Sequence, residues 1–100
     1  MASYYVRILQ GDSRPTPRLQ LLRNGSPVDL TGATVQLIVE GLSVPMTAEA
    51  DGYVDYVWNG ETSTMSAGTH KGRVCVTWPD TTVECWPDAD STFAIVIHAR

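Results

Sequence analysis

The segment DGYVDYVWNG (residues 51–60) alternates apolar and polar side chains, as a β-strand does. It also gathers two tyrosines, a tryptophan and two aspartates within ten residues, which suggests a second interpretation, a platform for a ligand. Successive side chains of a strand point to opposite faces. Val54, Tyr56 and Trp58 therefore share one large, uncharged face, and we predict that this face is core. The opposite face carries Asp55 and is expected to contact solvent or a partner.

The same pattern extends over the whole chain and predicts an all-β domain. The candidate strands are short, rich in β-branched and aromatic residues, and bounded by Gly, Pro, Asn or Asp. They span residues 4–10, 18–23, 34–40, 52–58, 71–78, 82–86 and 92–98, with a weaker one at 44–48. Asn24-Gly25 is the strongest turn signal, and 60–68 has room for one short helical turn. Seven or eight strands at this spacing indicate a β-sandwich or small barrel.

Alternation within these strands predicts a single core for the single domain 1–100. The predicted core comprises Val35, Leu37, Val39, Val54, Tyr56, Trp58, Val74, Val76, Trp78, Val83, Phe93, Ile95 and Ile97. With 43% hydrophobic and 18% charged residues the composition is that of a globular protein. A chain of 100 residues is long enough to form one core without metals or disulfides.

The charge balance argues against two classes of partner. The net charge is −4, and the seven Lys and Arg residues are dispersed, whereas nucleic-acid binding requires clustered cations. The apolar runs are far shorter than the ~20 residues that span a bilayer. The N-terminus MASYYVRILQ lacks the features of a signal peptide. We therefore expect no nucleic acid or membrane partner, and synthesis in the cytoplasm of the producing cell.

Cys75 and Cys85 flank a predicted hairpin, and the length of its turn decides whether they can pair. A two-residue turn at 80–81 places them on opposite faces, where a disulfide cannot form. A three-residue turn at 79–81 places them opposite each other, but it also puts Glu84 among apolar residues. Because the apolar face usually determines register, we predict the two-residue turn and two free thiols. Free thiols are typical of a reducing compartment.

The sequence offers no arrangement of residues typical of catalysis. His70 is expected in a loop and His98 at an exposed strand end, far apart in sequence. No glycine-rich phosphate loop is present, and the acidic residues near 80–90 lack the spacing of a calcium loop. We predict a protein that is not an enzyme and that needs no cofactor or metal.

Three stretches resemble a known family of modules. They are GDSRPTPRLQLLRNGSPVDLTGATVQLIV (11–39), DGYVDYVWNGETSTMSAGTHKGRVCVTWPDTTVECWP (51–87) and TFAIVIH (92–98). Together they resemble the immunoglobulin-like module at the N-terminus of phage baseplate upper proteins, and small phage tail and neck proteins. The resemblance implies an immunoglobulin-like β-sandwich of seven to eight antiparallel strands. Because this chain lacks the longer C-terminal part of those proteins, it further implies a stand-alone structural subunit.

On this resemblance we expect a structural virion component of a tailed bacteriophage, made in the bacterial host cytoplasm, that docks on other virion proteins and forms homo-oligomers. A capsid decoration or head-fibre base protein is an alternative within the same class. A carbohydrate-binding module that stacks sugars on Tyr53, Trp78 or Trp86 is an alternative from another class. Strands that are apolar on both faces are either core or interface. The candidate interface residues are Tyr4, Val6, Ile8, Leu19, Leu21, Tyr53 and Asp55.

Overall fold

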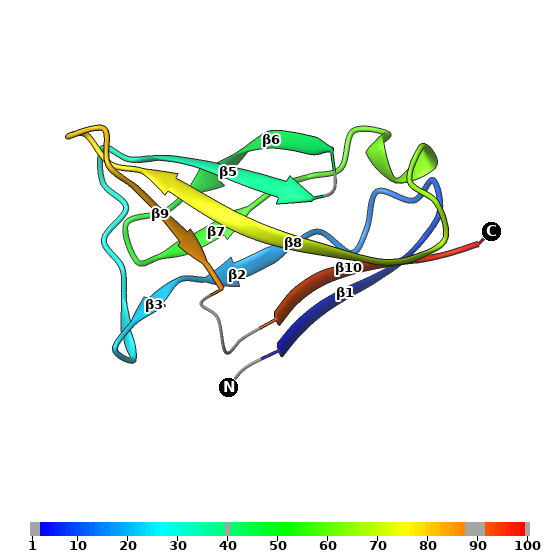
Figure 1. Cartoon of the computed structure of the whole chain (residues 1–100), viewed down its shortest axis with the longest axis horizontal. Helices are drawn as coiled ribbons and strands as arrows, with labels where there is room; N and C mark the ends of the chain where they lie inside the picture. Colours follow the sequence, from blue (N-terminus) through cyan, green and yellow to red (C-terminus); the bar gives the residue numbers. More distant parts are fainter. Residues whose placement is uncertain (1–2, 40, 88–91, 100) are drawn as a thin grey trace.

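Ten short strands and one 3₁₀ turn make up the regular structure in the computed structural model, which describes residues 3–39, 41–87 and 92–99 (Figure 1). The strands are β1 (Ser3–Leu9), β2 (Arg18–Gln20), β3 (Leu22–Arg23), β4 (Ser26–Pro27), β5 (Thr34–Val39), β6 (Leu42–Ala48), β7 (Tyr53–Asp55), β8 (Gly68–Thr77), β9 (Val83–Trp86) and β10 (Thr92–His98), and the 3₁₀ turn is η1 (Glu61–Ser63). The all-β prediction is confirmed. No helix within the described residues is long and apolar enough to cross a membrane.

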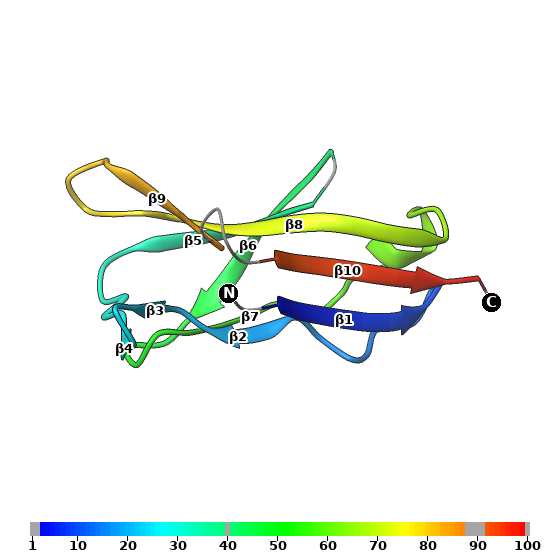
Figure 2. The same ribbon diagram turned by 60° about the horizontal axis from the view of Figure 1, so that its bottom comes forward.

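One curled sheet contains most of the strands, in the order β1-β10-β8-β5-β6-β7-β2. The sheet changes direction at β6, which pairs with β5 along Leu42–Met46 and with β7 through Thr47 and Ala48. As a result β5 and β8 lie on one side of the molecule, and β2 and β7 lie on the other (Figure 2). β9 pairs with the second half of β8, and β3 with β4 forms a separate small hairpin.

The expectation of purely antiparallel strands was wrong for one pair. β1 and β10 run parallel, with Tyr5 beside Ala94 and Arg7 beside Val96. Inward and outward side chains alternate in the same way whichever direction the neighbouring strand runs. The sequence pattern therefore locates both strands but carries no information on their relative direction.

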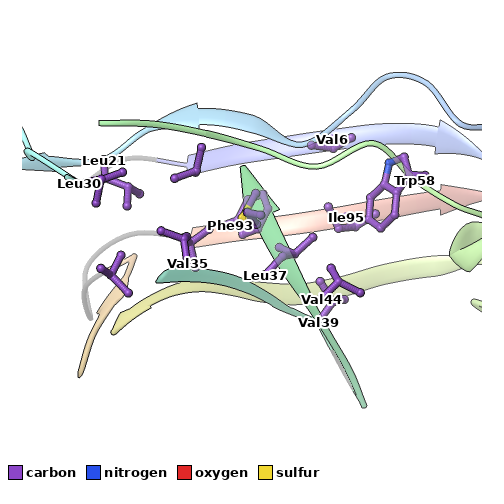
Figure 3. Packing of buried hydrophobic residues seen from close by; sticks show 14 of the residues in the cluster. Val6, Leu21, Leu30, Val35, Leu37, Val39, Val44, Trp58, Phe93 and Ile95 are labelled. Atoms are coloured by element: carbon purple, nitrogen blue, oxygen red, sulfur yellow. The ribbon is translucent and has the colours of Figure 1, made fainter. Parts of the chain in front are cut away.

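The core lies between the two sides of the curled sheet (Figure 3). Every predicted core residue except Val83 is buried or packs against the buried cluster. Tyr56 and Trp78 are the half-buried members of that set. Trp58 is 2% exposed, and its Nε1–H donates to the carbonyl of Pro15 at 3.1 Å, which satisfies its one polar group.

Backbone geometry explains why the predicted strand 18–23 is divided into β2 and β3. Leu21 lies at the break and is 1% exposed. Its N–H donates to the carbonyl of Gly52 at 2.8 Å, and its carbonyl accepts from the N–H of Val28 at 3.0 Å. The chain then turns back at Asn24-Gly25, where φ is +53° and +81°, as the turn prediction required.

The prediction of two free thiols was wrong, because Cys75 and Cys85 form a disulfide. They are direct partners in the β8–β9 ladder, with Cα atoms 4.0 Å apart. The turn has three residues, 79–81: the N–H of Trp78 donates to the carbonyl of Thr82, and the N–H of Thr81 donates back to that of Trp78. One extra turn residue moves each side chain of β9 to the other face.

The same register moves Val83 out of the core and Glu84 toward it. Val83 was predicted to be buried and is 61% exposed. Glu84 pairs with Val76, yet its side chain retains 38% exposure. Arg23, from the β3–β4 hairpin, donates to both carboxylate oxygens of Glu84. This bidentate hydrogen bonding compensates the acidic side chain for its position beside an apolar strand.

We expect the disulfide to contribute about 2–3 kcal/mol to the free energy of unfolding, because it closes a loop with a sequence separation of 10. Urea unfolding of the oxidised chain and of the double variant Cys75→Ser/Cys85→Ser measures that difference. Reductant should destabilise the parent and leave the double variant unchanged. Two thiols that react with a thiol reagent in denatured, unreduced protein would contradict the bond.

Candidate docking surface

β1 forms an open edge of the curled sheet. It pairs with β10 on one side and has no strand partner among the described strands on the other. Its outward side chains include Tyr5 and Leu9, which are 43% and 46% exposed. Between them lies Arg7, whose guanidinium carbon is 5.3 Å from the centroid of the Tyr5 ring. Free backbone groups beside exposed apolar side chains are typical of edges that take part in strand addition.

The candidate interface residues Val6, Ile8 and Leu21 are not on this surface. They are 3%, 2% and 1% exposed and belong to the core, so their prediction as contact residues was wrong. Both faces of the N-terminal strand are apolar in sequence, so alternation could not indicate which face is buried. Tertiary packing covers the face that carries Val6. The exposed face carries Tyr5 and Leu9, and the sequence pattern could not distinguish this face from the buried face of Val6.

Two further candidates, Tyr4 and Leu19, are half-buried at the border between β1 and β2. The ring of Tyr4 stacks on that of Phe93 with centroids 5.6 Å apart. Its hydroxyl donates to the carbonyl of Arg18 at 2.8 Å. Leu19 packs against the core cluster from the other side. These contacts hold the β1 edge over β2, and they leave little of either side chain for a partner.

Tyr53 and Asp55 lie on β7, which pairs with β2. The guanidinium of Arg18 sits 4.6 Å from the centre of the Tyr53 ring, and its Nη1 is 3.4 Å from Oε1 of Glu49. Asp55 is half-buried, and its buried Oδ1 accepts no hydrogen bond from the described residues. A contact role for Tyr53 and Asp55 remains a prediction.

The three aromatic residues considered for sugar stacking are already covered in part. Tyr53 lies under an arginine, and Arg23 lies 5.8 Å from the centroid of the Trp78 ring. Trp86 packs against the core, and its Nε1–H donates to the carbonyl of Leu22 at 3.1 Å. All three rings are half-buried and none forms an open platform.

A polar cluster joins the end of the opening segment to η1. Glu61 accepts hydrogen bonds from the hydroxyl of Tyr56 and from the N–H of Asn59. The hydrogen bond to Glu61, with help from burial and the negative charge, raises the pKa of Tyr56 to about 12. Burial acts to raise the pKa of Glu61, but the bonds from Tyr56 and Asn59 outweigh it and the pKa is lowered.

These shifts predict a pH window for the Tyr56–Glu61 bond. A raised tyrosine pKa stabilises the fold below the ordinary value of 10.0, and this contribution is lost as pH rises toward about 12. A lowered Glu61 pKa stabilises the fold above the ordinary value of 4.5, and this contribution is lost as pH falls. We expect an ultraviolet titration of the folded chain to show a tyrosinate step near pH 12.

Two variants assign that titration step. Tyr56→Phe should abolish it, and Glu61→Gln should move it toward 10.0, the ordinary value for tyrosine. Circular dichroism at each pH separates ionisation of the folded chain from alkaline unfolding. A late step that persists in Tyr56→Phe would contradict the hydrogen bond to Glu61.

The two histidines lie in different strands. His70 was expected in a loop but lies in β8, is 8% exposed, and has its Nε2 2.7 Å from the carbonyl of Ser66. With Glu61 and Met65 it lines a surface cavity of about 340 Å³. His98 is exposed at the end of β10, as expected. In the part of the chain that is described, no three His, Cys, Asp or Glu residues form a group that suits a metal.

The architecture of this chain resembles that of a solved protein structure. The fold is similar to that of the N-terminal domain of phage TP901-1 ORF48. The similarity covers 98% of this chain and 99% of that one, with a TM-score of 0.68 and 12% sequence identity. At this identity the likeness shows a shared fold. No family model matches the sequence, and no curated protein matches it significantly.

Proposed function

We propose that this chain is a structural subunit of a tailed-phage particle, in the tail, baseplate or neck, and that it acts by docking on other proteins. The observation that carries the proposal is the full-length similarity in fold to a domain of a phage protein. Because fold alone does not determine function, the surface must supply the rest of the argument.

The surface supports a docking role. Among the described strands β1 has no second partner, it contains no proline, and its edge exposes Tyr5 and Leu9 with Arg7 as its one charged residue. The partners are other virion structural proteins and further copies of this chain. The role is non-enzymatic, and the polar clusters described above serve structural contacts.

Particle composition tests the proposal directly. Antibodies raised against the purified chain are used for gold labelling of purified particles of the phage that encodes it, with pre-immune serum as control. We expect gold at one locus on the tail, baseplate or neck, and peptides of the chain in the mass spectrum of the same particles. A chain abundant in the lysate but absent from purified particles would overturn the proposal.

The same labelling distinguishes the alternatives. Gold over the head would favour a capsid decoration or head-fibre base protein in place of a tail component. A carbohydrate-binding module is less well supported, because Tyr53, Trp78 and Trp86 are half-buried and engaged in contacts within the chain. A glycan array that bound the isolated chain, with no particle labelling, would favour that module.

A further inference from the structure

The outward side of β8 and of its sheet neighbours β5 and β10 is cationic. These three strands contain two residues of the Lys, Arg, Asp and Glu types, and both are cations on β8: Lys71 and Arg73. Each is exposed and alternates with inward residues such as Val74, so each points away from the core. We call the outward side of these three strands the basic face.

Exposed apolar side chains border the basic face on β1. Ladder pairing places Tyr5 of β1 and Lys71 of β8 on either side of Ala94, which is 0% exposed. Tyr5 and Leu9 are almost half exposed. A face that combines cations with exposed apolar groups differs from an ordinary solvated one, because a partner can desolvate apolar area while charges guide its approach.

The opposite side of the molecule has the opposite sign. Glu49 and Asp51 are exposed in the turn between β6 and β7, and the half-buried Asp55 follows on β7. Arg18 is the one cation on the paired strands β2 and β7, and it contacts Glu49. We call this the acidic face. β8 and β7 lie on opposite sides of the molecule in Figure 2.

We propose that the basic face of one copy binds the acidic face of the next, so that the chain assembles head to tail. Two different, complementary faces on one molecule form a heterologous contact, which generates a closed ring or a filament. A two-fold contact through the basic face would instead bring Lys71 and Arg73 against their own copies, and like charges oppose such a contact. This inference rests on the proposed structural role and specifies how copies of the chain meet.

Charge reversal of each face tests the arrangement. The basic-face variant is Lys71→Glu/Arg73→Glu, and the acidic-face variant is Glu49→Lys/Asp51→Lys. Light scattering across a concentration series measures self-association, and circular dichroism with thermal unfolding checks that each variant folds. The parent should form oligomers that weaken with added salt. Each variant alone should associate at least about tenfold more weakly, because close charge pairs are reversed.

Mixing the two variants is the decisive measurement. One has two acidic faces and the other two basic faces, so an equimolar mixture should regain oligomers in which the variants alternate. The inference is overturned by a parent that stays monomeric at all concentrations. It is also overturned if only the basic-face variant loses association, which points to a two-fold contact, or if the mixture does not recover. Particle labelling is independent of these outcomes, so the structural role can stand if head-to-tail contact fails.

Discussion

Replacing Trp58 by alanine is expected to lower the free energy of unfolding by about 3–5 kcal/mol, the range for removing a buried large aromatic side chain. Trp58 is 2% exposed, and its ring meets that of Tyr56 edge to face at 5.7 Å between centroids. The substitution also leaves the carbonyl of Pro15 without its donor. Urea unfolding followed by circular dichroism measures the change.

The next residue back along the chain provides the control. Val57 is 61% exposed, so Val57→Ala should change stability by no more than about 0.5 kcal/mol. The variant Trp58→Phe should fall between the two, because it retains most of the packing and loses the N–H donor. Equal losses in the free energy of unfolding for Val57→Ala and Trp58→Ala would contradict the burial of Trp58 in the core.

Gly52→Ala is expected to destabilise the chain by about 3 kcal/mol or more, since it combines backbone strain with overpacking. Gly52 has φ of +90°, and an added Cβ would lie 2.8 Å from the carbonyl oxygen of Leu21 and 3.1 Å from the nitrogen of Val28. Those atoms belong to backbone that is itself hydrogen-bonded and cannot move aside cheaply. Chemical denaturation again gives the magnitude.

The variant Gly25→Ala separates the effect of backbone strain from that of overpacking. Gly25 has a similar φ of +81°, but no atom lies within 4 Å of its added Cβ. We expect it to cost only about 1–2 kcal/mol, the penalty of the left-handed conformation alone. If Gly52→Ala cost no more than Gly25→Ala, the close approach of Leu21 and Val28 to Gly52 would be refuted.

Local patterns were sufficient for the strands and for most of the core. Alternation in the opening segment placed Val54 and Trp58 inward, and the structure leaves them 0% and 2% exposed. Asn24-Gly25 identified its turn because few other residue pairs tolerate two positive φ values. Each of these features depends on interactions between residues close in sequence.

The register of the cysteine pair was predicted wrongly because we assumed that the apolar face determines strand register. A two-residue turn at 80–81 would require positive φ at Asp80 in type II′, or at both Asp80 and the β-branched Thr81 in type I′. The three-residue turn places only Thr81 there, at +73°. Asp80 supports it by accepting hydrogen bonds from the hydroxyl and N–H of Thr82, which also lower the pKa of Asp80. Turn chemistry therefore outweighed the apolar pattern that favoured the other register.

Alternation and turn chemistry act over a few residues, so they were enough to predict that the chain is all-β, where most of its strands lie, and which side chains of most strands share a face. Tertiary structure alone decided the direction of β1 against β10, the covered face of the N-terminal strand, and the separation of basic and acidic faces. These features depend on contacts between distant segments. A strand apolar on both faces, such as β1, becomes core on one and surface on the other only when its neighbours are in place.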